Sequence, residues 1–254
     1  MTLHIETSGD GADLVLLHGW GMHGGIWSNM RGELARRFRV HAVDLPGYGA
    51  SPACEPYTLA VVADALAHAF PEAVNVCGWS MGALLAQTWA LRHPAQVARL
   101  TLVAGTPCFA ARADWPHGIS ADILREFSES LARDYEGTLK RFLSLQARGD
   151  KQAKEVMADL RRQLFARGRP TQCVLEAGLR ILLATDLRAQ TEHIKQPALL
   201  IHGARDLLAP LGAAQWLSER LPHAKLHVIA DAAHAPFLSH ANEFIELITG
   251  FMHE

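Results

Sequence analysis

The sequence predicts an α/β fold: a mostly parallel central sheet flanked by helices, with one inserted block of helices. Short apolar runs alternate with segments of helical period, and such runs are typical of strands that a parallel sheet buries on both faces. Between residues 108 and 188 the strands stop and helical period dominates. One strand leads into the pentapeptide Gly78–Gly82, of the form G-x-S-x-G, and a helix leads out of it. These observations indicate one sheet domain organised around a single turn.

Length and composition exclude several classes of function. A chain of 254 residues, 49% of them apolar, suffices for one domain with a substantial core. The net charge of −2 argues against general nucleic-acid binding. No apolar run approaches the roughly 18–20 residues that span a bilayer. The first residues lack the features of a signal peptide, and the four cysteines form no CxxC pair. We therefore expect a reduced, cytoplasmic protein with no nucleic-acid or membrane partner. No exposed apolar stripe stands out, which favours a monomer.

The expected strands follow one another along the chain with helices between them. Six short, apolar segments are predicted as strands: residues 14–17, 38–43, 73–77, 100–105, 198–203 and 226–230. Helical spacing predicts helices over 58–70 and 83–90, and an amphipathic closing helix over 242–252. Alternation of this kind is typical of parallel strands joined by helical crossovers.

The block over residues 108–188 is predicted as a helical lid inserted in a core formed by residues 1–107 and 189–254. Its helical segments are 120–134, with Ser120 as N-cap, 136–147, 151–166 and 171–183. Residues 137–170 carry nine basic and three acidic side chains, a local charge of +6. Both a solvated helix face and a docking surface for an acidic partner are consistent with this charge.

The turn at Gly78–Gly82 is predicted to be a nucleophile elbow. A chance match is the alternative, since the pattern is short, but the flanking strand and helix favour the elbow. The sharp turn strains the backbone at Ser80, so that positions 78 and 82 must be small, and both are glycine. The backbone N–H of Met81 then lies at a helix N-terminus, where an oxyanion is stabilised.

A second glycine-rich turn, His18-Gly19-Trp20-Gly21, follows the first predicted buried strand. Its glycines allow the backbone to approach a ligand, and we assign the second oxyanion-hole N–H to Trp20. The indole of Trp20 is then expected to line the acyl pocket, although a plain core aromatic is the alternative. His18 is interpreted as structural, shaping the turn.

Ser80, Asp206 and His234 each follow a predicted strand, in the order nucleophile, acid, base. A serine hydroxyl needs a base to take its proton, and a histidine with a free pKa near roughly 6.5 can take it and return it. The aspartate orients the imidazole. His240 is the rival base, and Asp44, which precedes the nucleophile, is interpreted as stabilising a turn. No metal-ligand spacing and no phosphate-binding glycine loop occurs, so neither metal nor cofactor is expected.

These residues resemble the α/β-hydrolase superfamily over essentially the whole chain. Within it, the sequence is similar to the pimeloyl-[acyl-carrier protein] methyl ester esterases of biotin biosynthesis. The motifs that carry the closer resemblance are LLHGWG from Leu16, VDLPGYG from Val43, GWSMG from Gly78, PCF from Pro107, DWP from Asp114, RFLSLQ from Arg141 and AAHAPF from Ala232. The lid motifs discriminate best, because HG and G-x-S-x-G are shared across the superfamily.

The resemblance implies the α/β-hydrolase fold and a cofactor-free carboxylesterase. Such an enzyme removes the methyl group from the distal carboxyl of a pimeloyl chain on acyl carrier protein, through an acyl-enzyme on Ser80. It also implies a set of substrate-binding residues: Trp20, Ser80, Met81, Phe142, Leu143, Ser144, Leu145, Gln146 and His234.

Basic lid residues of the family contact the acidic carrier protein. Arg141 and Lys154 match such positions. Gly137 and Ala158 stand where the resemblance leads us to expect arginines, so the contacts are expected to shift to Arg161 and Arg162.

Two other classes of function stay open from the sequence. One is another enzyme of the same fold, such as a general short-chain esterase, a thioesterase, a C–C bond hydrolase or a cofactor-free haloperoxidase. The other is a non-catalytic binding protein that has kept the fold, against which the intact set of three catalytic residues argues.

Overall fold

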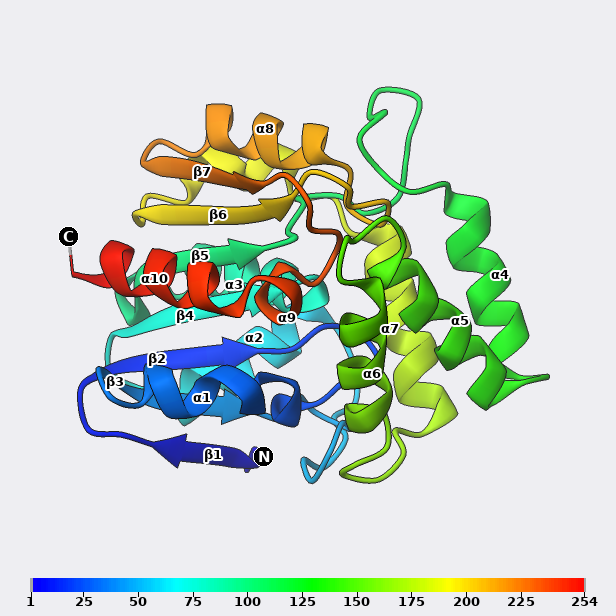
Figure 1. Cartoon of the computed structure of the whole chain (residues 1–254), viewed down its shortest axis with the longest axis horizontal. Helices are drawn as coiled ribbons and strands as arrows, with labels where there is room; N and C mark the ends of the chain where they lie inside the picture. Colours follow the sequence, from blue (N-terminus) through cyan, green and yellow to red (C-terminus); the bar gives the residue numbers. More distant parts are fainter. Residues whose placement is uncertain (1, 254) are drawn as a thin grey trace.

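The computed structural model describes residues 2–253 and contains one seven-stranded sheet in the order β1-β3-β2-β4-β5-β6-β7 (Figure 1). The strands are β1 (Ile5–Ser8), β2 (Ala12–Leu17), β3 (Phe38–Val43), β4 (Val74–Trp79), β5 (Val97–Val103), β6 (Ala198–Gly203) and β7 (Ala224–Ile229). Strand β1 pairs antiparallel with β3, and every other neighbouring pair is parallel. The carboxyl ends of β2–β7 therefore meet at one edge of the sheet.

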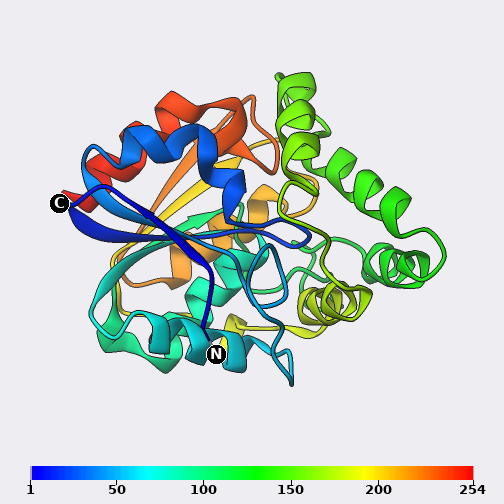
Figure 2. The ribbon, with the colours of Figure 1, turned by 90° about the horizontal axis from the view of Figure 1, so that it is seen from below.

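Helices cover both faces of the sheet (Figure 2). On one face lie α1 (Ser28–Leu34) and α10 (Ala241–Met252), which contact each other. On the other lie α2 (Leu59–Ala69), α3 (Met81–Arg92) and α8 (Leu211–Arg220). Short helical turns complete the core: η1 (Gly24–Trp27), η2 (Pro94–Gln96), η3 (Arg188–His193) and α9 (Pro236–Ser239). Because both faces are covered, the side chains of Leu14–Leu17 in β2 are fully buried, which explains the continuous apolar run there.

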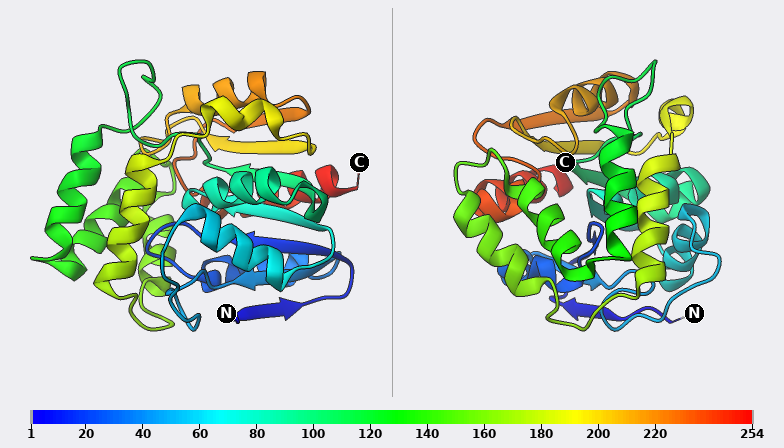
Figure 3. Two further views of the ribbon diagram at one scale, coloured as in Figure 1. Left: turned by 180° about the vertical axis from the view of Figure 1, so that it is seen from behind. Right: turned by 90° about the vertical axis from the view of Figure 1, so that its right-hand side faces the viewer.

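Four helices leave the sheet between β5 and β6 and lie at its carboxyl edge (Figures 1 and 3). They are α4 (Ala121–Leu131), α5 (Tyr135–Ala147), α6 (Ala153–Gln163) and α7 (Gln172–Ala184). Three begin at side-chain caps, where Ser120, Asp134 and Thr171 each accept a hydrogen bond from a backbone N–H of the first turn. We refer to residues 108–188 as the lid.

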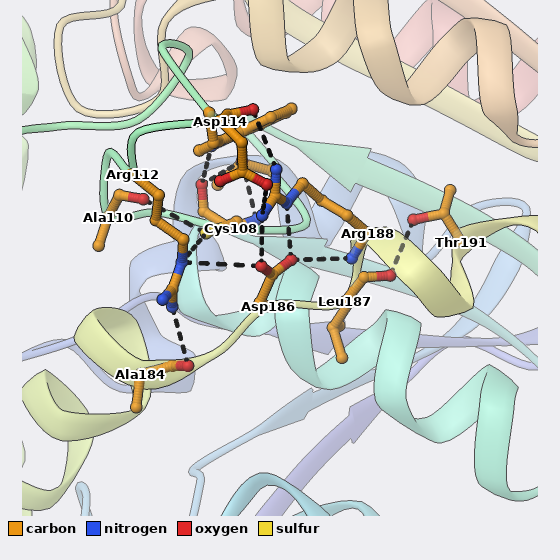
Figure 4. A network of polar contacts seen from close by, with 11 residues as sticks. Cys108, Ala110, Arg112, Asp114, Ala184, Asp186, Leu187, Arg188 and Thr191 are labelled. Carbon is orange, nitrogen blue, oxygen red and sulfur yellow. Dashed lines mark hydrogen bonds and ion pairs between the residues drawn. The ribbon is translucent and has the colours of Figure 1, made fainter.

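The two segments that lead into and out of the lid are bound to each other (Figure 4). Arg188 forms ion pairs with Asp186 (2.7 Å) and Asp114 (3.0 Å). Arg112, on the incoming segment, contacts Asp186 at 3.7 Å and donates to the carbonyl of Ala184 at 3.1 Å. These contacts hold the base of the lid as one unit.

The structure contains all six predicted strands, the predicted helices and the four lid helices, with ends shifted by a few residues. Helix α6 is shorter than expected, because the chain turns into α6 over residues 151–152 and leaves it beyond Gln163. The elements that the sequence pattern did not reveal include β1, α1 and α8. Strand β1 is a four-residue edge strand with no apolar run, so it lacks the signal that marks the buried strands.

Candidate active site

Ser80 lies at the sharp turn between β4 and α3, with the backbone in a conformation that side chains seldom adopt (φ 58°, ψ −118°). A Cβ on Gly78 would lie 2.2 Å from the carbonyl oxygen of Gly82. A Cβ on Gly82 would lie 2.5 Å from the carbonyl oxygen of Leu17 in β2. Both contacts are with backbone, so the turn closes only with glycine at these positions, and the hydroxyl of Ser80 is held at the carboxyl edge of the sheet.

Ser80, His234 and Asp206 form a continuous hydrogen-bonded chain. The Oγ of Ser80 lies 2.8 Å from Nε2 of His234, and Nδ1 of the same ring lies 2.8 Å from Oδ2 of Asp206. Ser80 comes from the turn after β4, Asp206 from the loop after β6, and His234 from the loop after β7. The sheet thus brings together three residues that lie up to 154 positions apart.

Asp206 is fully buried as a side chain, and its charge is compensated locally. Burial by itself raises the pKa of this carboxyl, but the facing imidazole of His234 and further donors lower the pKa below its usual range. The backbone N–H of Ala209 is one of these donors, at 2.9 Å from Oδ1, and the N–H of Leu208 also donates to Oδ1 at 2.8 Å. A carboxylate that stays ionised can hold the imidazole in one tautomer and stabilise an imidazolium.

The loop that carries His234 is held from both the core and the lid. From the elbow, the indole Nε1 of Trp79 donates to the carbonyl of His234 at 2.8 Å. From the lid, the carbonyl of Gln146 accepts from the backbone N–H of His234 at 3.1 Å. The carboxylate of Asp150 accepts from the N–H of Ala233 at 2.8 Å. The lid therefore contributes to the position of the base as well as covering the site.

The turn at His18–Gly21 lies directly against the nucleophile. A Cβ on Gly19 would come within 3.2 Å of the Cβ of Ser80. The ring of His18 is buried; its Nδ1 lies 2.8 Å from the carbonyl of Gly19, and its Nε2 accepts from the N–H of Leu45 at 3.0 Å. Burial lowers the pKa of His18 to about 4, so the ring is neutral and acts in shaping the turn.

Asp44 stabilises the neighbouring turns, as expected for a carboxylate outside the hydrogen-bonded chain. Its Oδ1 accepts from the N–H of Gly24 at 2.7 Å, and its Oδ2 accepts from the N–H of Ala50 at 3.0 Å. Arg167 of the lid pairs with it at 3.1 Å. The rival base is also placed elsewhere: Nδ1 of His240 contacts the hydroxyl of Ser239 at 2.9 Å.

The backbone N–H groups of Trp20 and Met81 donate to no other group among residues 2–253, so both can donate to an oxyanion next to Ser80. The indole of Trp20 differs from the expectation. Its Nε1 donates to the carbonyl of Leu175 in α7 at 2.8 Å, and its ring packs against Phe142 at 4.7 Å. The ring does not line the cavity at Ser80, and the lid helix α7 supplies the acceptor that its N–H needs when buried.

A small cavity of about 10 Å³ adjoins Ser80, room for about one water molecule. Its lining side chains come from the core and the lid: Ser80, Phe109, Ile119, Leu124, Phe142, Leu182, Leu208 and His234. Apart from the nucleophile and the base, the lining side chains are apolar. The cavity holds no room for an acyl chain.

The segment predicted to line the acyl channel, residues 142–146, is divided between different surroundings. Phe142 lines the cavity. Ser144 and Leu145 line a groove on the outside of the lid, and Leu143 is buried without lining either space. The backbone carbonyl of Gln146 accepts a hydrogen bond from the N–H of His234. Successive residues of an α-helix point in directions about 100° apart, so five in a row cannot all face one channel.

Five lining residues were absent from the sequence prediction: Phe109, Ile119, Leu124, Leu182 and Leu208. Phe109 lies in the PCF motif of the family resemblance; the other four show in the sequence only an apolar side chain within or beside the lid, which does not separate them from ordinary core residues. Met81 is buried beneath the nucleophile and its side chain does not line the cavity.

The predicted docking residues lie on the outer surface of α5 and α6. Arg141, Lys154 and Arg161 are exposed and form no ion pair among residues 2–253. Arg162 is exposed and paired with Asp159. Five of the nine basic side chains over residues 137–170 are in ion pairs: Lys140, Lys151, Arg162, Arg167 and Arg169. The unpaired charge on the lid is therefore smaller than the count of residues indicates.

Within the described part of the chain, no three His, Cys, Asp or Glu side chains are grouped so that they could hold a metal ion. No helix over residues 2–253 is long and apolar enough to cross a membrane. The arrangement that remains is a nucleophile, a base and an orienting acid, beside two free N–H donors. This arrangement can perform acyl transfer from an ester or thioester to water.

Comparison with known proteins places this geometry in a family. The family model described as alpha/beta hydrolase fold matches residues 14–241. The pimeloyl-[acyl-carrier protein] methyl ester esterase of Nitrosomonas europaea is 47% identical over 244 residues, which cover 96% of this chain and 97% of that protein. The enzyme of the same description from Chromobacterium violaceum is 47% identical over 248 residues, 98% of this chain and 97% of that protein.

Solved structures show the same fold at lower sequence identity. An esterase from Exiguobacterium antarcticum superposes with a TM-score of 0.89 at 23% identity, covering 99% of this chain and 96% of that protein. At this identity the likeness concerns the fold, which agrees with the sheet order and the position of the lid described above.

Proposed function

Since the chain belongs to the α/β-hydrolase family and, within it, to the pimeloyl-[acyl-carrier protein] methyl ester esterases, we propose that it hydrolyses the methyl ester of a pimeloyl chain carried on acyl carrier protein. The products are methanol and the free distal carboxylate. The observation that carries the chemistry is the unbroken chain of 2.8 Å contacts from Ser80 through His234 to Asp206. The chain is a carboxylic ester hydrolase, and the reaction belongs to biotin biosynthesis.

The proposed mechanism uses an acyl-enzyme. His234 Nε2 takes the proton of Ser80 as the Oγ attacks the distal ester carbonyl. The N–H groups of Trp20 and Met81 donate to the oxyanion of the tetrahedral intermediate. His234 then gives its proton to the leaving methoxide, so methanol departs and the pimeloyl group stays on Ser80. In the second half His234 activates water, which releases the carboxylate and restores the serine.

The first test is removal of the nucleophile. Ser80→Ala should lower kcat for a methyl ester by several orders of magnitude while leaving the fold intact. A fluorophosphonate probe should label the wild-type protein and not the variant. A folded wild-type protein that the probe does not label would instead favour a non-catalytic binding protein.

We propose further that the exposed basic side chains of the lid dock the acidic carrier protein. Lys154 and Arg161 on α6 support this, because both are exposed, unpaired and seven positions apart, so that they share one face of the helix. Ala158 lies between them on that face, and Arg162 is next to it. Arg141 provides a further cation on α5.

The docking proposal is tested with kcat/KM for the carrier-bound methyl ester against free dimethyl pimelate. Lys154→Glu and Arg161→Glu should lower the value for the carrier-bound ester by about fivefold to tenfold each and leave the free ester unchanged. Rising salt should weaken the preference for the carrier in the wild-type enzyme. Lys195→Glu, before β6 at the opposite edge of the sheet, serves as the matched control. Equal rates for both substrates at all salt concentrations would indicate a general esterase.

A further inference from the structure

An apolar groove of about 350 Å³ lies on the outside of the lid, between α4 and α5. Its lining residues are Ile123, Glu126, Phe127, Arg141, Ser144 and Leu145. Two side chains in contact lie between the groove and the small cavity at Ser80. Phe127 of α4 faces the groove, Phe142 of α5 faces the cavity, and their rings meet edge to face at 5.5 Å.

The same helix forms walls of both spaces. Leu124 of α4 lines the cavity, and Ile123 and Phe127 of α4 line the groove. An outward displacement of α4 would therefore separate Phe127 from Phe142 and join the groove to the cavity. The cavity of about 10 Å³ holds no acyl chain until such a movement occurs.

Helix α4 is also the lid helix whose attachment to the rest of the described chain is entirely apolar. Among the described residues, all its hydrogen bonds and ion pairs stay within residues 120–134. It rests on its neighbours through apolar side chains, chiefly Leu124, Phe127 and Leu131. Figures 1 and 3 show it as the lid helix farthest from the sheet. Moving α4 would therefore expose apolar side chains but would break no hydrogen bond or ion pair to the rest of the described chain.

The other three lid helices are each hydrogen-bonded to the core. The carbonyl of Gln146 in α5 accepts from the N–H of His234. The carbonyl of Gln163 in α6 lies 2.7 Å from Nε2 of His23, and that of Leu175 in α7 accepts from the indole of Trp20. Displacing α5 or α7 would break a contact of His234 or Trp20, and displacing α6 would break a contact with the core, whereas displacing α4 would break none of these.

We propose that α4 is the movable wall of the acyl entrance, and that the Phe127–Phe142 pair is the gate through which a linear acyl chain passes from the groove to Ser80. The inference rests on the proposed function, since the occupant is the acyl chain of the ester. The apolar lining suits its methylene groups. The far end of the chain emerges beside Arg141, with Glu126 on the opposite rim, at the basic outer surface of α5.

The test compares two free methyl esters with the same leaving group, methyl acetate and dimethyl pimelate. Phe127→Ala should raise the ratio of kcat/KM for dimethyl pimelate to that for methyl acetate by about fivefold, the effect expected for loss of one aromatic pair. Phe127→Trp should lower the same ratio by a similar factor. Phe127→Leu, which preserves more of the packing, should raise it to a smaller extent and serves if the alanine variant does not fold. Phe165→Ala, a lid aromatic that lines neither space, is the matched control.

Unchanged ratios in the folded variants would overturn the proposal. A lower ratio in Phe127→Ala would overturn it too, because Phe127 would then be a binding wall and not a gate. General damage to the lid would change both esters together and leave the ratio as it is. Because both esters are free of carrier, the result does not depend on whether the wild-type enzyme prefers carrier-bound substrate.

Discussion

Asp150 offers the sharpest test of the conclusion that the lid positions the catalytic base. This carboxylate is buried in the loop after α5 and accepts two backbone N–H groups at 2.8 Å, that of Gln152 on Oδ1 and that of Ala233 on Oδ2. Ala233 immediately precedes His234, and its N–H has no other acceptor among residues 2–253. Asp150→Ala therefore leaves a buried donor without a partner beside the base.

The magnitude follows from this lost contact. A hydrogen bond from a buried N–H to a carboxylate contributes about 1.5–3 kcal/mol. Two contacts still hold the loop, from Trp79 and from the carbonyl of Gln146, so we expect His234 to be displaced but not released. If the lost energy appears fully in the transition state, kcat falls by about 13- to 160-fold. The free energy of unfolding should fall by a similar 1.5–3 kcal/mol.

Steady-state hydrolysis of dimethyl pimelate measures this effect, with urea unfolding as the parallel readout. We expect kcat to fall and KM to change little, because Asp150 does not line the cavity. Asp150→Asn should also lose activity, since Gln152 and Ala233 donate to different oxygens and the amide replaces one of these acceptors with an NH2 donor. Asp122→Asn, whose carboxylate is exposed on α4, is the control and should stay within about twofold of wild type. Wild-type kcat in both Asp150 variants would refute the positioning role of the lid.

Three further predictions concern the core. Gly78→Ala places a Cβ 2.2 Å from the carbonyl oxygen of Gly82 and should destabilise the protein by about 3 kcal/mol. The control Gly32→Ala, at a position with open space around it, should not destabilise the protein. Equal unfolding curves for the two variants would contradict the elbow geometry. Burial lowers the pKa of His18 from 6.5 to about 4. Between these pH values only the unfolded chain takes up the proton, so the free energy of unfolding decreases by up to about 3 kcal/mol as the pH is lowered. Measured by urea unfolding from about pH 7 to pH 4, the free energy of unfolding should decrease less for His18→Asn than for wild type. An equal decrease in both proteins would show that the protonation of His18 does not contribute to the pH dependence. Asp206→Asn should lower kcat by about four orders of magnitude through the wrong imidazole tautomer, and a loss under tenfold would argue that another acid acts.

The lid and the catalytic chain form one structural unit in this protein. The indole of Trp20 reaches α7, the loop of His234 is bound to α5, and Arg167 of the lid pairs with Asp44 of the core. Substitutions in the lid can therefore change kcat without touching substrate. This coupling is the reason for measuring ratios between two esters when the gate is tested.

The local sequence was sufficient to predict the sheet strands that are buried, the elbow and the three residues that the structure joins by hydrogen bonds. Each of these rests on short-range chemistry. A strand buried on both faces must be apolar throughout, and a strained turn requires glycine on both sides of Ser80. In parallel strands the carboxyl ends meet at one edge, so Ser80, Asp206 and His234 could be predicted to meet from their positions after strands alone.

Only the tertiary structure decided which lid residues face the nucleophile. Helical period shows that one side of a helix is buried, but not whether it is buried against the core, a neighbouring lid helix or the cavity. Phe142 and Leu145 lie three positions apart on α5, yet one lines the small cavity and the other the outer groove. The indole of Trp20 likewise faces α7, because a buried N–H needs an acceptor. Here the acceptor is the carbonyl of Leu175, which lies 155 positions away along the chain.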